Sequence, residues 1–169
     1  MNWEAFGALA EMVGAVGVIL SLLYLAGQVR QNTKLARAQT RQALADGAQS
    51  LASDFLNPDG MARVMWRHLE GEEFVGEELL RLTARAYRDF RFMENAHYQY
   101  SQGLLTPEEW EGFRVNLQVL LEIPAYKDYW ESQAPIFSPA FRNEMASLAE
   151  KSPLDLISKQ VKLPPKPGD

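Results

Sequence analysis

Glu94 and His97 form a Glu-x-x-His pair, a spacing that metal ligands use in helical bundles. Residues three apart on a helix project from the same face, and di-iron bundles combine two such pairs with two further glutamates. This sequence has no second Glu-x-x-His, and its other histidine, His68, has no carboxylate three residues before it. We therefore expect Glu94 and His97 to be hydrogen-bonded at the edge of an aromatic core. A sensor or enzyme pocket near them is the alternative.

Other patterns that carry chemistry are missing from the sequence. It contains no GxxxxGK[ST] phosphate loop, no GxGxxG, no HExxH and no GxSxG motif. It also has no cysteine, so disulfides and thiolate metal sites are excluded, which fits a reducing compartment. We predict no catalytic residue, no cofactor and no metal, and the sequence selects no class of enzyme.

The longest apolar stretch, residues 5–29, is the element that organises the chain. About 20 mostly apolar residues cross a hydrocarbon core roughly 30 Å thick, so this stretch predicts one transmembrane helix. A buried core helix or a cleaved signal peptide is the alternative. A signal peptide has a basic leader, whereas the residues before this stretch include no Lys or Arg.

Glu11 is the single carboxylate inside the apolar stretch. A carboxylate in a span is costly and tends to face a protein interior or a polar cavity, which makes it a functional candidate. It lies about 9 Å along the helix axis from Ala5, so its side chain could also reach the outer headgroups. Small residues recur beside it at spacings of three and four and predict a helix–helix interface in lipid: Gly7, Ala10, Gly14, Gly17 and Ser21.

Basic residues follow the stretch and none precedes it: Arg30, Lys34, Arg37 and Arg41. Lys and Arg near a span stay on the cytoplasmic side, so the N-terminus is expected outside and the C-terminal domain in the cytoplasm. This basic face predicts contact with lipid headgroups or docking of an acidic partner. The alternative is a solvated face that only sets the topology. The net charge of -5 argues against a nucleic-acid partner.

The fold class predicted is all-α, with one transmembrane helix that continues into a cytoplasmic bundle of about five or six helices. The expected parts are a transmembrane helix at 1–29, a basic helical stalk at 30–57, a cytoplasmic helical domain at 58–158 and a Pro-rich tail at 159–169. Within the domain we expect helices over 61–69, 77–100 and 107–122, then short helices up to Pro135, after Ser138 and at Ser152. Inward positions are expected to include Leu69 on the first helix and two apolar stripes on the second, with Leu80, Tyr87 and Phe90 on one of them.

Two blocks of the sequence carry a resemblance to known proteins. The first is the YLAGQVRQNT segment at residues 24–33, together with Trp3-Glu4-Ala5 and the Gly-rich span. The second comprises Glu94, Tyr98-Gln99-Tyr100 and Gly103-Leu104-Leu105. With these two blocks the chain resembles a group of uncharacterised bacterial membrane-anchored proteins. The resemblance implies a location in the bacterial inner membrane and no established activity.

The hypothesis that follows is a single-pass accessory or scaffold subunit. Its transmembrane helix would pack against other membrane helices, of its own kind or of a larger complex, and its helical domain would dock partners in the cytoplasm. The second hypothesis is a self-assembling homo-oligomer or narrow pore with Glu11 at the helix contact. The third is the pocket near Glu94 and His97.

Overall fold

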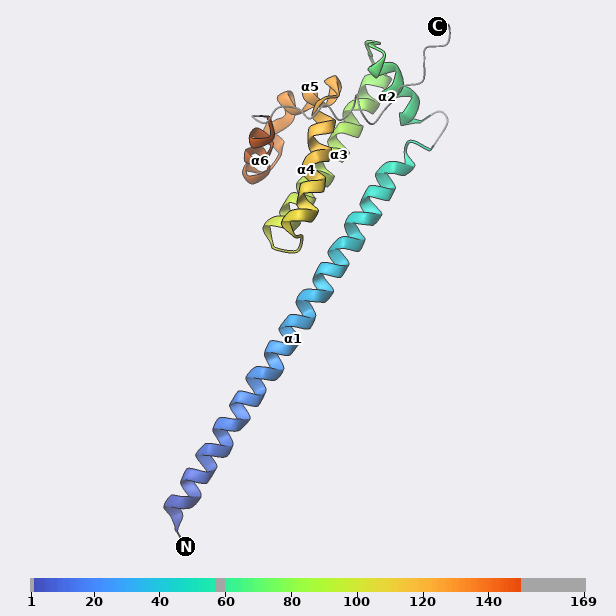
Figure 1. Cartoon of the computed structure of the whole chain (residues 1–169). Coiled ribbons are helices and arrows are strands. Elements are labelled where there is room, and N and C mark those ends of the chain that lie inside the picture. The colour runs from blue at the N-terminus through green and yellow to red at the C-terminus, as the bar shows by residue number, and fades with distance from the viewer. Residues whose placement is uncertain (1, 57–59, 150–169) are drawn as a thin grey trace. The chain divides into compact units, whose positions relative to one another are not determined.

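The computed structural model describes residues 2–56 and 60–149, apart from the side chains at positions 5, 6, 10 and 149. Within these residues the chain forms six α-helices and one 3-10 helix and contains no strand, which confirms the all-α prediction (Figure 1). The chain divides into two compact units, Met1–Arg41 and Gln42–Asp169. The turn predicted at Ser152 and the Pro-rich tail at 159–169 lie outside the described residues.

Helix α1, Trp3–Ser53, runs without a break through the predicted span and most of the predicted stalk. Its sequence contains no proline, the residue that breaks helices most strongly. Among the described residues it is the one helix long and apolar enough to cross a membrane, and none of its apolar window is buried within the chain. The prediction of one long apolar N-terminal helix is therefore confirmed.

Helix α3, Glu77–Ser101, is the centre of the second unit. It contacts α2 (Met61–Leu69), α4 (Pro107–Leu121), α5 (Pro124–Gln133) and α6 (Pro139–Ala149). A short 3-10 helix at Ala134–Ile136 joins α5 to α6. The buried apolar side chains of α3 recur every three or four residues and so form one stripe: Leu82, Ala86, Phe90, Met93 and Ala96. These helices pack around that stripe, so the core of the unit is built on one face of α3.

Local signals place the starts of the last three helices. Thr106 Oγ1 accepts the Glu109 N–H at 3.2 Å, and the Glu109 carboxylate accepts the Thr106 N–H at 2.7 Å, so α4 begins with the predicted capping box. Pro107 is the first residue of α4, where a missing N–H leaves no hydrogen bond unmade. Pro124 and Pro139 occupy the same position in α5 and α6. Each of these helices therefore starts at a proline.

Four side chains expected to face inward are exposed instead. Leu69 is 46% exposed, Leu79 at the start of the first stripe of α3 is 47% exposed, and Leu80 and Tyr87 on the second stripe are 67% and 43% exposed. Phe90, expected on the same stripe as Leu80 and Tyr87, is buried. The prediction of a second buried stripe on α3 is therefore wrong apart from Phe90, because the bundle covers the first stripe and leaves these positions to solvent.

Candidate functional site

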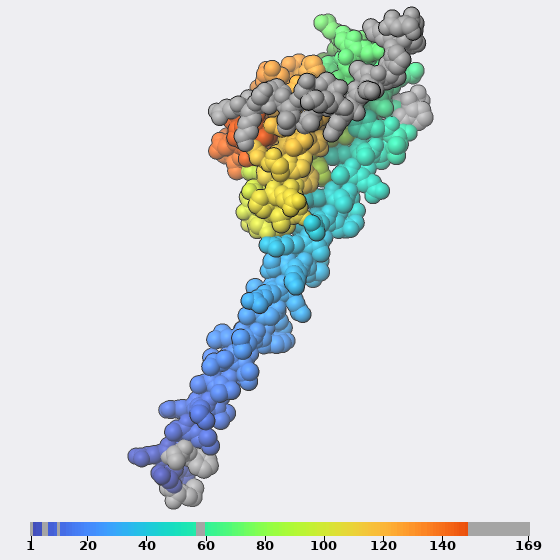
Figure 2. All heavy atoms as spheres, in the orientation of Figure 1, coloured from blue at the N-terminus to red at the C-terminus, as the bar shows by residue number. Residues whose placement is uncertain are grey.

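The apolar part of α1 presents large hydrophobic side chains around most of the helix. Consecutive residues Val18, Ile19 and Leu20 are all more than half exposed, as are Leu22 and Leu23. Figure 2 shows side chains standing out all along the first unit. Contiguous apolar surface of this extent is rare on soluble monomers and marks contact with a membrane or a protein partner. This surface is the largest candidate interaction site in the described chain.

The predicted stripe of small residues lies on this exposed helix. Gly7, Gly14, Gly17 and Ser21 are exposed, and a methyl group added at any of the three glycines would meet nothing within 4 Å. The Ser21 hydroxyl donates to the Gly17 carbonyl at 2.8 Å, so the one polar side chain of the stripe is satisfied by its own helix. The side chain of Ala10 lies outside the described residues. The stripe therefore offers a surface on which another backbone could approach closely.

Glu11 and the basic residues of α1 differ in the contacts that they make within the described residues. The Glu11 side chain is exposed and forms no hydrogen bond or ion pair within the described residues. Arg30, Lys34, Arg37 and Arg41 are exposed as well, and the last two take part in interactions with neighbouring residues. The carboxylate that was expected to be costly in lipid thus has no partner among the described residues.

Glu94 and His97 lie one turn apart on α3, and each is engaged with a different set of groups. The two carboxylate oxygens of Glu94 accept from Arg91 at 2.6 Å and from the Ser138 N–H at 2.7 Å. Burial alone raises the pKa of Glu94, but these hydrogen bonds outweigh burial and the pKa lies below its usual value. Glu94 therefore anchors the start of α6 to α3.

The His97 imidazole packs among aromatic rings instead of pairing with Glu94. Its ring centroid lies 5.2 Å from that of Trp110 and 5.8 Å from that of Phe141. No group of three or more His, Asp and Glu side chains in the described residues is arranged to hold a metal ion. Glu94 and His97 thus share a helix face, as predicted, but the hydrogen bond predicted between them is not formed among the described residues. The Glu94 carboxylate is occupied by Arg91 and Ser138, and the His97 ring packs against Trp110 instead.

A buried ionic network lies on the other side of α3, and the sequence reasoning missed it. Arg85 Nε donates to Asp89 Oδ2 at 2.8 Å, and the Tyr126 hydroxyl of α5 donates to the same oxygen at 2.5 Å. Arg85 Nη1 also donates to the Leu51 carbonyl at 2.7 Å and lies 3.2 Å from Asp54 Oδ2. Burial and the Asp89 carboxylate raise the pKa of Tyr126, so its hydroxyl stays a donor. The network ties the end of α1, α3 and α5 together.

The sequence does contain a weak signal for this network. Arg85 and Asp89 stand four residues apart, next to the buried Ala86 and Phe90, so two opposite charges follow the edge of an apolar stripe. Tyr126 is 37 residues from Asp89. The pair could have been proposed from spacing alone, whereas its partner on α5 could not.

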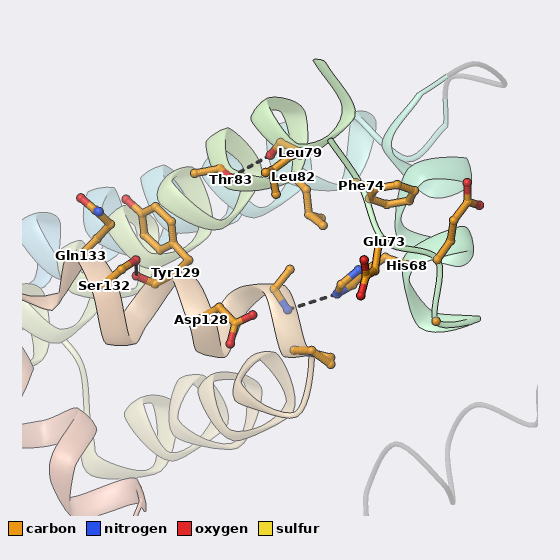
Figure 3. Close-up of a pocket in the computed structure, with 14 residues that line it drawn as sticks. His68, Glu73, Phe74, Leu79, Leu82, Thr83, Asp128, Tyr129, Ser132 and Gln133 are labelled. Atoms are coloured by element: carbon orange, nitrogen blue, oxygen red, sulfur yellow. Dashed lines mark hydrogen bonds between the residues drawn. The ribbon is translucent and has the colours of Figure 1, made fainter. Parts of the chain in front are cut away.

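A cavity of about 520 Å³ opens between α3, one side of α5 and the loop that follows α2. Figure 3 shows His68 and Phe74 on one side of it, and Asp128 and Tyr129 of α5 on the other. Its volume is within the range of small-molecule sites, about 300–1,000 Å³. This cavity was not predicted from the sequence, in which His68 lacks a carboxylate at metal-binding spacing.

His68 is held at the rim of this cavity by a backbone group of α5. The Ala125 N–H, which lies in the first turn of the helix, donates to His68 Nε2 at 3.1 Å (Figure 3, dashed line). The imidazole therefore supplies one of the acceptors that the first turn of a helix lacks. Because Nε2 accepts, the neutral ring carries its proton on Nδ1. Two residues hint at this contact in the sequence: Pro124, which indicates the start of a helix, and Phe74, an apolar residue of the loop. In the structure Phe74 is buried.

No protein-family model, curated protein or solved structure matches the chain.

Proposed function

We propose that the protein is a single-pass accessory or scaffold subunit of a bacterial inner membrane. The segment at 5–29 would cross the bilayer and pack against other membrane helices, and the helical domain would dock partners in the cytoplasm. The observation that carries this proposal is the exposure of large apolar side chains along α1 from Leu9 to Val29, with none of the apolar window buried. In water such a surface is strongly unfavourable, and in hydrocarbon it is not.

The orientation in this proposal rests on charge. The first 29 residues contain no Lys or Arg, and exposed basic side chains begin at Arg30. Basic residues next to a span remain on the cytoplasmic side and gain about 1 kcal/mol each near anionic lipid. The bundle would therefore lie in the cytoplasm and the N-terminus outside. The inner membrane as location rests on the resemblance carried by residues 24–33.

Extraction of membranes tests whether α1 is in lipid. We expect the full-length chain to stay in the pellet after washing with alkaline carbonate and to be released by detergent. Leu20→Arg with Leu23→Arg puts two charges in the middle of the segment. Each charge raises the free energy of membrane insertion by about 2.5–3.5 kcal/mol, so this variant should be released by the wash. Leu35→Arg with Ala38→Arg, beyond the segment, is the matched control and should stay bound. A full-length chain that is soluble without detergent would refute the proposal.

Moving the basic residues tests the orientation. A variant in which Arg30, Lys34, Arg37 and Arg41 become Gln, with four Lys added before the span, should invert. A reporter fused after the bundle would read its compartment. If the reporter still reads cytoplasmic in this variant, the charge argument is wrong.

Packing through the small residues is tested by filling the stripe. Gly14→Leu with Gly17→Leu should break up assemblies in mild detergent while insertion is kept, because Leu side chains hold two helix backbones apart. Ala26→Leu with Gly27→Leu adds nearly the same bulk on a different side of the helix and should leave assembly unchanged. An unchanged particle size for both pairs would show that the stripe is ordinary composition.

Glu11, which has no hydrogen-bond or ion-pair partner among the described residues, favours a second candidate, a self-assembling homo-oligomer with this carboxylate at the helix contact. Mass measurement of the detergent-solubilised native complex separates the two. Other chains that co-purify support the accessory subunit, whereas a closed oligomer of this chain alone supports self-assembly. A lone monomer contradicts both. We do not propose a pocket at Glu94, because both of its carboxylate oxygens are engaged in helix contacts.

A further inference from the structure

We propose that the cavity beside His68 binds a small organic cation that carries an apolar body, such as an aryl-alkyl ammonium ion. This site lies in the second unit and does not depend on the proposed membrane role. Three features of the cavity support this: its volume of about 520 Å³, its apolar and aromatic walls, and the excess of carboxylates among its lining residues.

The walls of the cavity are apolar and partly aromatic. Phe74, Leu82 and Tyr129 line it and are at least nine-tenths buried, while Leu79 lines it and remains 47% exposed. Buried side chains of this kind form a preformed wall, and an exposed leucine at the mouth leaves apolar area that a ligand can cover. The cavity therefore suits a ligand with a compact hydrophobic part.

Carboxylates dominate the charge of the lining. Glu72, Glu73 and Asp128 line the cavity, and no Lys or Arg does. Glu72 is neutralised by an ion pair with Arg67, whereas Glu73 and Asp128 form no ion pair or hydrogen bond within the described residues. Within the part of the chain that the structure describes, the cavity therefore has two uncompensated negative charges at its mouth, which attract a cation and repel an anion.

The remaining polar groups do not offset these charges. His68 accepts the Ala125 N–H through Nε2 and is neutral in that arrangement. Burial raises the pKa of Tyr129, so its phenol is uncharged as well. A bare metal ion is disfavoured, because the described residues bring no three His, Asp and Glu side chains together as ligands. An organic cation can place its apolar body against the apolar walls and its positive charge near the carboxylates.

The test uses the full-length protein in a neutral detergent and three probes of the same shape. These are the 2-phenylethylammonium ion, the neutral 2-phenylethanol and the phenylacetate anion, each titrated by isothermal calorimetry and saturation-transfer NMR. We expect the ammonium ion to bind more tightly than either of the others, and its binding to weaken as salt screens the exposed carboxylates.

Charge variants identify the site. Glu73→Gln with Asp128→Asn should weaken binding of the ammonium ion about two- to twenty-five-fold, from about 0.2–1 kcal/mol for each exposed carboxylate. Glu108→Gln with Glu131→Gln removes the same net charge from exposed positions that do not line this cavity, and should leave binding unchanged. Both pairs are exposed, so circular dichroism should report the same fold for each. Comparison of the two also corrects for partition of the probe into micelles.

Three results would overturn the proposal. The first is no saturable binding of the ammonium ion below about 10 mM, the range expected for so small a ligand. The second is equal binding of the alcohol or the anion, because the charge would then play no part. The third is equal weakening by the two variant pairs, because the attraction would then come from the net charge of the protein and not from this cavity.

Discussion

Replacing Asp89 by Ala tests whether the buried network holds the second unit together. Asp89 is 5% exposed and Arg85 6%, so the variant leaves a guanidinium shielded from water without its nearest carboxylate. Removal of one partner of a buried ion pair costs about 3–5 kcal/mol. Asp54 Oδ2 still lies 3.2 Å from Arg85 Nη1 and offsets part of that loss. We therefore expect a loss of about 3 kcal/mol in the free energy of unfolding.

Three companion variants separate the contributions. Tyr126→Phe removes one hydrogen bond to a carboxylate and should cost about 1.5–3 kcal/mol. Arg85→Met with Asp89→Leu removes both charges and should cost less than Asp89→Ala alone, because no unpaired charge remains. Glu77→Ala removes the partner of Arg81 in an exposed pair and is the matched control, with an expected cost below about 1 kcal/mol.

The assay is urea unfolding of the full-length protein in a neutral detergent, followed by tryptophan fluorescence. Trp3→Phe in every variant removes the signal of the first unit and leaves Trp66, Trp110 and Trp130, which all lie in the second. The midpoint and slope of each curve then give the free energy of unfolding. If Asp89→Ala and Glu77→Ala lose the same free energy, then Arg85 and Asp89 do not form a buried ion pair.

A pH series on the same variants gives an independent check. Burial and the Asp89 carboxylate raise the pKa of Tyr126 above its usual value of 10.0. A raised pKa means that the unfolded chain loses the phenol proton first, so stability is complete below pH 10.0 and falls as the pH rises further. Tyr126→Phe should make this alkaline decline shallower, by up to about 1.4 kcal/mol per pH unit. Tyr129, whose pKa burial also raises, keeps part of the decline in place.

Three further predictions use the same assay. The pKa of Glu94 is lowered from 4.5, because its hydrogen bonds outweigh its burial. The stabilisation by Glu94 is therefore present above pH 4.5 and lost as the pH falls, and Glu94→Gln should reduce this loss of stability at acid pH. Gly112→Ala should stabilise α4 by about 0.5–1 kcal/mol, because the added methyl group meets nothing within 4 Å. Gly47→Ala is the matched control: it would place its Cβ 2.8 Å from Phe92 Cε2 and should not stabilise the protein. Thr106→Ala should cost about 1 kcal/mol by removing the capping box; an unchanged midpoint would contradict it.

Local signals in the sequence were sufficient for much of the fold. The bounds predicted for α2 match the observed Met61–Leu69, and Thr106 caps α4 as its spacing with Glu109 indicated. Such features depend on residues a few positions apart, whose geometry is set once a helix forms. The exposed Leu80 and Tyr87 show the opposite case. Periodicity shows that a face is apolar, and only the tertiary arrangement decides whether another helix covers it.

The candidate sites show why spacing alone does not assign chemistry. Glu94 and His97 share one face of α3, as their spacing required. The Glu94 carboxylate nevertheless accepts a hydrogen bond from the N–H of Ser138, which is 44 residues away, and the His97 imidazole packs against Trp110. His68 has no carboxylate at the metal-binding spacing, yet it lines a cavity because a loop and the first turn of α5 meet around it. In both cases the chemistry open to the side chain is set by donors, rings and charges that come from distant parts of the chain. A histidine that looks unremarkable in the sequence is therefore the better candidate for a ligand site, and the one in the motif is the better candidate for a packing role.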